Sequence, residues 1–337
     1  MSPILKRSLA ALGLLVTLAG PAAAQKTIVV QTWGGAFFDA VTSVKADIEK
    51  MAGSRVEFVA QATSVTGLQR LEAQKANPQV DLWMTADATA ATALAEGIIE
   101  PFPRDLAPNL KDIPPELIYP AGPTIWSSPR GIFYRADRTP FPIKKWEDLW
   151  DPRLKGMITT TIDSDKGMFV IIAAMLAGGN EKNIGPGFEK LKALKPNLGV
   201  LYKADAESLK LVQAGEVNVS GYGVLGIIYK LLGPGSNYRF VMPESPQFMS
   251  VSLVTMVKGR PNRAEAAKVV DAILDPSIQE RIVEQIGSIP SNRHAKAPSR
   301  IRDVIPPTMK LVTPDWDYVN AHYGEWVERW NREIATR

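Results

Sequence analysis

Residues 26–60 read KTIVVQTWGGAFFDAVTSVKADIEKMAGSRVEFVA. Two runs rich in β-branched residues, 26–32 and 55–60, flank a helical pattern over about 36–51, and a glycine pair follows the first run. Strand, helix and strand at this spacing are typical of a parallel sheet with a right-handed crossover. The stretch therefore predicts an α/β fold.

The same alternation continues along the chain. Further strands are predicted at 80–85, 156–161, 200–203 and 217–222, and further helices at 65–75, 88–97, 167–177, 187–195, 205–214, 223–232, 262–273, 276–286 and 315–334. Two extended segments, 124–135 and 250–259, separate the two α/β units. This order predicts two lobes with a ligand cleft between them, because ligands bind beyond the carboxyl ends of parallel strands.

The N-terminus has the pattern of an export signal. Lys6 and Arg7 precede an uncharged run, 9–20, and then PAAAQ. We expect a cleavable secretory signal peptide over residues 1–24 and a periplasmic location. The alternative is an uncleaved anchor, but twelve helical residues span about 18 Å, whereas a bilayer core is about 30 Å thick. No later apolar run is long enough to span, so the protein is not expected to be membrane-inserted.

Composition argues against several kinds of chemistry. The chain has 39 Lys and Arg against 35 Asp and Glu and no long basic run, so nucleic acid is not an expected partner. It has no cysteine and only two histidines, His294 and His322. Cysteine nucleophiles and thiolate metal sites are excluded, and multi-histidine sites or Ser-His-Asp triads are disfavoured. We expect no metal, no cofactor and no catalytic residues.

The candidate ligand-binding residues lie at predicted strand ends and on the extended segments. They are Trp33, Gly34, Gly35, Ser64, Thr85, Asp87, Ser127, Arg130, Thr161, Asp163, Lys166, Tyr222, Ser250 and Ser252. Trp33 could supply a flat apolar wall or a cation–π face, with a core position as the alternative. Asp87 is equally suited to line the cleft or to cap a helix. Tyr222 could line the cleft or be purely structural.

The segment TTTIDSDKG, 159–167, allows several interpretations. Asp163 or Ser164 is suited to cap the helix that begins near Gly167. The helix start, the hydroxyls and Lys166 together could hold a carboxylate or a phosphate. Asp163 and Lys166 could instead bind the amine and the acid of one zwitterion, or Lys166 could simply be solvated. Arg130 could clamp an anion or bridge the two lobes through a pair with Asp or Glu.

Three further segments carry a family resemblance. KKWEDLWDPRLKGMI (144–158), AGEVNV (214–219) and KGRPNRAEAAKVVDAILDPSIQERIVEQIGSIPSN (258–292) resemble segments of periplasmic solute-binding proteins of ABC importers. The resemblance is nearest to the spermidine/putrescine, thiamine and ferric-ion groups. It implies the type II two-lobed fold with a mostly parallel sheet in each lobe. It also implies delivery of a small-molecule ligand to a membrane permease that is powered by a separate ATPase.

The lobes follow from the resemblance and the two extended segments. Lobe one is expected over 25–126, lobe two over 127–248, and a return to lobe one with the C-terminal helix over 249–337. We expect a monomer.

The resemblance also bears on the ligand. Trp33 and Asp163 match an aromatic and an acid that polyamine-binding relatives use, but Lys166, Ser250 and Ser252 fall where those relatives have further acids and an aromatic. Tyr222 stands alone where ferric-ion binders have adjacent tyrosines. The sequence thus favours an anionic or zwitterionic ligand, such as a carboxylate, organophosphate or phosphonate. Thiamine or a polyamine is the alternative, and a periplasmic enzyme using Asp163 and Asp165 is the alternative of another class.

Overall fold

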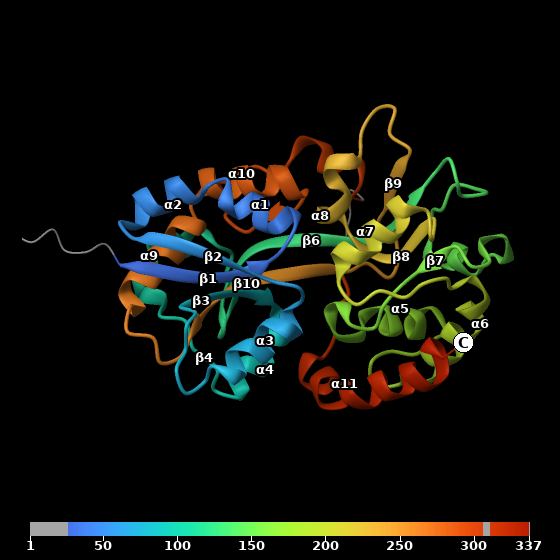
Figure 1. The fold of residues 1–337 in the computed structure, drawn as a ribbon, viewed down its shortest axis with the longest axis horizontal. Coiled ribbons are helices and arrows are strands. Elements are labelled where there is room, and N and C mark those ends of the chain that lie inside the picture. The colour runs from blue at the N-terminus through green and yellow to red at the C-terminus, as the bar shows by residue number, and fades with distance from the viewer. Residues whose placement is uncertain (1–25, 306–310, 337) are drawn as a thin grey trace, which may run out of the picture.

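The computed structural model describes residues 26–305 and 311–336 (Figure 1). The expected signal peptide lies outside the described residues. The strands are β1 (Thr27–Trp33), β2 (Arg55–Gln61), β3 (Leu82–Ala86), β4 (Ile99–Glu100), β5 (Ile118–Tyr119), β6 (Gly122–Arg135), β7 (Ile158–Thr159), β8 (Val219–Val224), β9 (Tyr238–Val241), β10 (Met249–Val257) and β11 (Ile289–Pro290). The helices are α1 (Ala36–Thr42), α2 (Lys45–Ala52), α3 (Ser64–Ala73), α4 (Asp87–Ala95), α5 (Met168–Leu176), α6 (Gly185–Leu194), α7 (Asp205–Ala214), α8 (Leu225–Ile228), α9 (Arg263–Ile273), α10 (Pro276–Ile286) and α11 (Trp316–Trp330).

Lobe one is a three-layer unit built on the parallel strands that the sequence predicts. β1 pairs in parallel with both β2 and β3. One face of this sheet packs against α1, α2, α9 and α10, and the other packs against α3 and α4. Side chains of β1 alternate toward these two layers, with Ile28 and Val30 completely buried in the first. The two faces explain why β1 is apolar along most of its length.

Lobe two repeats the three layers with a different sheet. α5 and α6 cover one face, and α7 and α8 cover the other. Among the described strands of this lobe, only β7 and β8 pair in parallel, whereas β6 is antiparallel to both β8 and β9. The two-lobed α/β fold is therefore confirmed, but this sheet is not mostly parallel. The reason is that β6, a long crossing strand, occupies its centre.

Two long strands connect the lobes. β6 pairs with β10 as far as Pro129 and then, from Arg130, with β8. β10 returns antiparallel to β6 and continues beside β3. These are the two extended segments of the sequence, and they make one mixed sheet whose main path runs β2-β1-β3-β10-β6-β8-β7. Figure 1 shows them running side by side between the lobes.

The C-terminal helix was expected in lobe one, but it packs on lobe two. Val319, Trp326 and Trp330 of α11 belong to the hydrophobic core formed with Trp146 and Phe169. Figure 1 shows α11 under α5 and α6. The tryptophans are buried, as their spacing predicted, but spacing alone does not say against which lobe.

Residues 200–203 were expected to form a strand and do not. Tyr202 N donates to the carbonyl of Thr160 at 3.2 Å, but no ladder follows. The Tyr202 side chain is buried and its hydroxyl donates to the carbonyl of Tyr222. The segment is therefore apolar because it is buried beside β7 and β8, although it is not a strand of the sheet.

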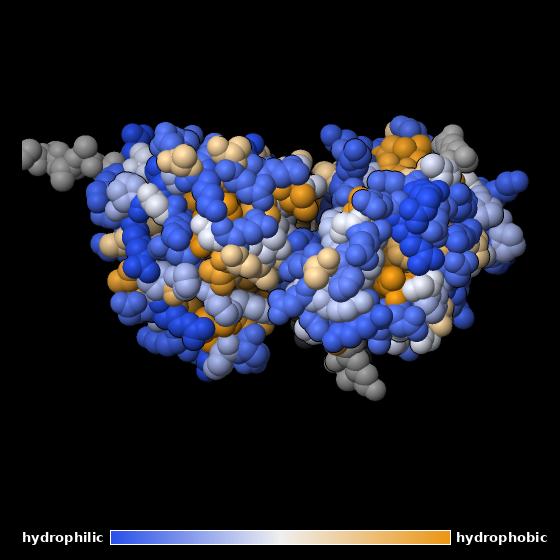
Figure 2. All heavy atoms as spheres, turned by 90° about the horizontal axis from the view of Figure 1, so that it is seen from below, coloured by the Kyte–Doolittle hydropathy of each residue, from blue (hydrophilic) through white to orange (hydrophobic). Residues whose placement is uncertain are grey.

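The face shown in Figure 2 has two bodies with a waist between them, and it is mostly hydrophilic with scattered apolar patches. Within 26–305 and 311–336, no helix combines the length and the apolar character needed to cross a bilayer.

Candidate functional site

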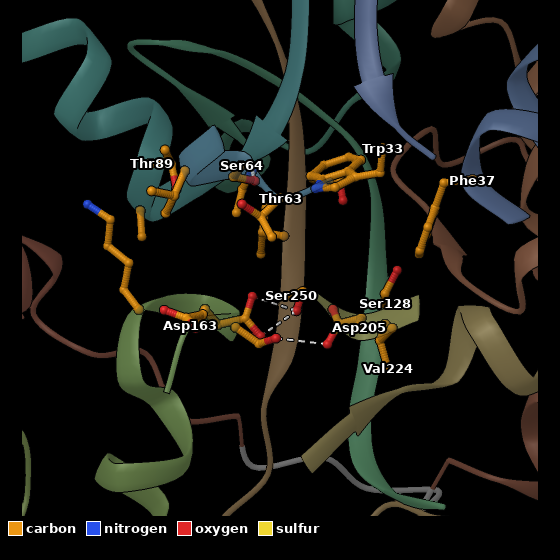
Figure 3. Close-up of a pocket in the computed structure, with 18 of the residues that line it drawn as sticks. Trp33, Phe37, Thr63, Ser64, Thr89, Ser128, Asp163, Asp205, Val224 and Ser250 are labelled. Atoms are coloured by element: carbon orange, nitrogen blue, oxygen red, sulfur yellow. Dashed lines mark hydrogen bonds between the residues drawn. The ribbon is translucent and has the colours of Figure 1, made fainter. Parts of the chain in front are cut away.

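A cavity lies between the two lobes, where the predicted strand ends meet. The space between its walls is about 930 Å³ when the open solvent at its mouth is included. A concave site lined by aromatic and polar side chains is typical of a small-molecule site. Figure 3 shows residues of the two lobes on opposite sides of the cavity. The labelled residues of lobe one are Trp33, Phe37, Thr63, Ser64 and Thr89. Those of lobe two are Asp163, Asp205 and Val224.

Nine of the predicted residues lie at the cavity wall. They are Trp33, Gly34, Ser64, Asp87, Arg130, Asp163, Lys166, Ser250 and Ser252. They come from both lobes and from both crossing strands. Strand ends rich in Gly, Ser, Thr and Asp therefore located the cavity, because parallel strands bring their carboxyl ends to one edge.

Five predicted residues do not line the cavity. Thr85 and Tyr222 are completely buried, and the Thr161 hydroxyl accepts a hydrogen bond from the Asp163 amide at 2.9 Å. Ser127 points away, and its neighbour Ser128 faces the cavity because side chains alternate along β6. Gly35, at φ 65°, serves the turn that starts α1.

Arg130 is the centre of a buried ion-pair network. Its Nε lies 2.6 Å from Asp165 Oδ2 and also donates to Ser250 Oγ at 2.6 Å, and its Nη1 lies 2.9 Å from Asp205 Oδ2. The guanidinium stacks over the Tyr222 ring at 5.2 Å from the centroid. Burial lowers the pKa of Arg130, but the two carboxylates outweigh burial and raise it well above its usual value. Arg130 thus pairs with acidic residues of the protein, as one alternative held, but Asp165 and Asp205 both belong to lobe two and the pairs do not bridge the lobes.

The Asp163–Gly167 turn has an unusual backbone. Asp165 and Lys166 both adopt a left-handed conformation, with φ of 49° and 48°. Such residues cost of order 1–3 kcal/mol each unless their surroundings hold them. In this turn the Asp165 carboxylate accepts hydrogen bonds from Tyr222 Oη and Ser250 Oγ. Asp163 was expected to cap the following helix, but its side chain makes no capping hydrogen bond.

Lys166 is buried and bonded within the protein rather than solvated. Its Nζ donates to Thr92 Oγ1 at 2.7 Å and to Asn320 Oδ1 at 2.6 Å. Only 8% of the residue is exposed. Burial lowers the pKa of its ammonium group from 10.5 to about 8. Both cations of the cavity wall, Lys166 and Arg130, are therefore already bonded to protein oxygens.

Two carboxylates of the wall differ from those bound to Arg130. Asp87 accepts a hydrogen bond from Trp316 Nε1 at 2.9 Å, and Asp163 has a contact of 3.4 Å with Tyr323 Oη. Within the described part of the chain, neither forms an ion pair. Burial raises the pKa of both carboxyl groups, that of Asp87 to about 7 with a further contribution from the charge of Asp165. These are the acidic groups that remain available to a ligand.

Carboxylates thus outnumber cations on the cavity wall. Asp87, Asp163, Asp165 and Asp205 face two cations. The sequence offered Lys166 and Arg130 as groups that could hold an anion, but the carboxylates of the wall outnumber these two cations. Among the residues described, no cluster of His, Asp and Glu has the arrangement of a metal site.

The sequence analysis missed several wall residues. Phe37 and Trp316 add aromatic surface, and Phe37 lies 5.9 Å from Trp33 between ring centroids. Phe37 could have been found from its place in the first turn after the glycine pair. Asp205 could have been found as the first residue of a predicted helix. Trp316 could not, because it reaches the cavity from α11, a helix that is distant in sequence from every predicted site residue.

The titration of Asp87 predicts a pH dependence of stability. Because its pKa rises from an ordinary 3.8 to about 7 on folding, the native state binds more protons than the unfolded state between these values. This contribution to stability is therefore complete below about pH 4 and is lost as the pH rises through 7. Urea unfolding of the wild type and Asp87→Asn at several pH values measures it. The variant should gain relative stability with rising pH, and a difference that stays constant with pH would refute the assignment.

The sequence of this chain is similar to those of extracellular solute-binding proteins. The sequence profile of the family described as bacterial extracellular solute-binding protein matches residues 43–304. A putative 2-aminoethylphosphonate-binding periplasmic protein of Salmonella typhimurium is 23% identical over 315 residues, covering 89% of this chain and 87% of that protein. The spermidine/putrescine-binding periplasmic protein of the same organism is 24% identical over 246 residues, covering 68% and 67%.

A solved structure shows the same fold. A periplasmic binding protein from Actinobacillus pleuropneumoniae with bound fructose-6-phosphate has a TM-score of 0.76 and 20% identity, over 94% of this chain and 100% of that one. The sequence resemblance to solute-binding proteins is thereby confirmed. The chain belongs to the family of bacterial extracellular solute-binding proteins.

Proposed function

We propose that this protein captures a small molecule carrying an ammonium group in its interlobe cleft. As a periplasmic monomer, it delivers that molecule unchanged to the permease of an ABC importer, which a separate ATPase powers. The ligand is a zwitterion or an amine rather than a simple acid.

The observation that carries this proposal is the pair of carboxylates without a cationic partner. Asp87 comes from the first turn of α4 in lobe one, and Asp163 comes from the turn before α5 in lobe two. They line the cleft from opposite lobes, so a ligand that contacts both carboxylates would hold the lobes together. Charge-assisted hydrogen bonds to a partly buried carboxylate are among the stronger polar contacts.

The same wall does not offer an anion a free cation. Lys166 donates to Thr92 and Asn320, and Arg130 is neutralised by Asp165 and Asp205. A lone acid would have to break one of these pairs. The sequence disfavoured a polyamine because the ammonium group of Lys166 would face it, but that group is bonded to protein oxygens of both lobes.

An acidic group on the same ligand has a different place to bind. Thr63, Ser64 and Thr89 put hydroxyls on the wall at the first turns of α3 and α4. Amide groups and the helix dipole at such turns favour negative charge. Two relatives are named for the ligands spermidine/putrescine and 2-aminoethylphosphonate. These ligands differ in their acidic groups, but each contains a primary amine. An ammonium group is therefore common to these two ligand classes, although the fructose-6-phosphate in the solved structure lacks one.

Binding rather than catalysis fits the acidic residues. The enzyme alternative used Asp163 and Asp165 as an acid pair, but Asp165 is held in an ion pair with Arg130 at 2.6 Å. A carboxylate so bound is a poor general base, because the neighbouring cation stabilises its ionised form. The family and the solved structures similar to this chain are likewise binding proteins.

Calorimetric titration of the wild type, Asp163→Asn and Asp87→Asn tests the proposal. The probes are putrescine, spermidine and 2-aminoethylphosphonate. We expect at least one probe to bind the wild type and each substitution to weaken it at least tenfold, about 1.4 kcal/mol. Glu57→Gln is the matched control, because Glu57 is exposed on β2. The proposal fails if none of the amines binds, or if the two cleft variants bind like the control.

A further inference from the structure

We propose that Lys166, Trp316 and Asn320 form a clasp that fastens helix α4 of lobe one to lobe two, so that contacts within the chain favour closure even without ligand. The term "clasp" denotes these three residues together with Asp87, Ala88 and Thr92 of α4. The inference concerns the motion of the lobes and does not depend on the identity of the ligand.

The clasp is a set of hydrogen bonds across the lobe boundary. Lys166 Nζ donates to Thr92 Oγ1 at 2.7 Å, Trp316 Nε1 donates to Asp87 Oδ2 at 2.9 Å, and Asn320 Nδ2 lies 3.4 Å from the carbonyl oxygen of Ala88. Lys166 Nζ also donates to Asn320 Oδ1 at 2.6 Å. One side of each crossing contact therefore belongs to α4, and the other belongs to lobe two.

The lobe-two side is firmly attached to its own lobe. Trp316 and Asn320 lie near the start of α11, whose Trp326 and Trp330 are buried in the lobe-two core. Figure 1 shows the first turns of α11 reaching toward α4 beneath the waist. Because α11 does not belong to lobe one, its contacts with α4 must separate when the lobes open.

Contacts of the neighbouring residue, Asp165, fix the backbone at Lys166. Its neighbour Asp165 is fixed by Arg130 on β6 and by Ser250 on β10, the two strands that connect the lobes. Both Asp165 and Lys166 have positive φ, so they direct successive side chains to different places. One turn thus joins the crossing strands to the clasp.

The burial of Lys166 makes its hydrogen bonds matter. Hydrogen bonds from a charged donor are stronger than those between neutral groups, and a buried charge without acceptors is costly. Within the residues that the structure describes, the acceptors of its ammonium group are neutral oxygens from both sides of the boundary. Removing either the ammonium group or its lobe-one acceptor should therefore release α4.

Distances between spin labels test the clasp. The chain has no cysteine, so exposed Gln69 on α3 and Glu325 on α11 can be replaced by cysteine as labelling sites. Double electron–electron resonance then measures the interlobe distance in protein freed of ligand by unfolding, dialysis and refolding. In this labelled background we expect a closed population, and about a tenfold lower ratio of closed to open molecules in Lys166→Met and in Thr92→Val.

Two controls keep the result interpretable. Lys155→Met removes an exposed lysine of lobe two and should leave the distances unchanged. Thr92→Val has nearly the shape of threonine, so it tests the clasp if Lys166→Met fails to fold. A ligand-free protein that is fully open, or clasp variants with the distance distribution of the control, would overturn the inference. Neither result would alter the affinities that test the proposed function.

Discussion

Replacing Arg130 with methionine is expected to lower the free energy of unfolding by about 3–5 kcal/mol. The substitution keeps an extended side chain but removes the cation that pairs with Asp165 and Asp205. Asp165 has only 6% of its side chain exposed, so its carboxylate would be left buried without a cationic partner. Guanidinium chloride unfolding, followed by circular dichroism at pH 7, measures the loss.

Arg153→Met is the matched control for this prediction. Arg153 also forms an ion pair, with Asp151, but 61% of its side chain is exposed. Exposed pairs of this kind contribute about 0–1 kcal/mol. Equal small losses for the two variants would show that the Arg130 network does not stabilise the fold.

Replacing Trp326 with alanine is expected to cost about 3–5 kcal/mol as well, for a different reason. Trp326 is 4% exposed and lies in the hydrophobic core of lobe two. It also packs close to the Gly167 backbone, where an added Cβ would lie 3.2 Å from its ring. Unfolding should therefore begin in lobe two, which hydrogen exchange can show through faster exchange of α5 and α11 than of α1 and α2.

Met51→Ala is the control for the core substitution. Met51 is an exposed apolar residue of α2, with 49% of its surface accessible. Its loss should change stability by less than about 0.5 kcal/mol. If exchange in Trp326→Ala accelerated equally in both lobes, or only in lobe one, the placement of α11 on lobe two would be contradicted.

The sequence predicted the fold well where local patterns decide it. The alternation of strands and helices predicted both α/β units, and the two extended segments became the crossing strands β6 and β10. It failed where long-range packing decides. The apolar face of α11 is clear from the spacing of its tryptophans, but two lobes were available to cover it.

For the candidate site too, local patterns were predictable from the sequence and long-range contacts were not. Trp33 and Asp163 were found because strand ends of a two-lobed α/β protein converge on the cleft, and Ser250 because it lies on an extended segment between the lobes. The partners of Arg130 and Lys166 were not predictable, because Asp205, Thr92 and Asn320 are distant in sequence. Charge at a site depends on such partners, so counting Lys166 and Arg130 as free cations gave the wrong sign.

Calorimetric titration with matched ligand pairs tests the central claim, that an ammonium group is what the cleft recognises. Each pair differs only in the amine: 2-aminoethylphosphonate against ethylphosphonate, and putrescine against butane-1,4-diol. We expect an amine to bind and its partner to bind at least a hundredfold more weakly, which corresponds to about 2.7 kcal/mol. Equal or tighter binding of the compound that lacks the amine would contradict the account.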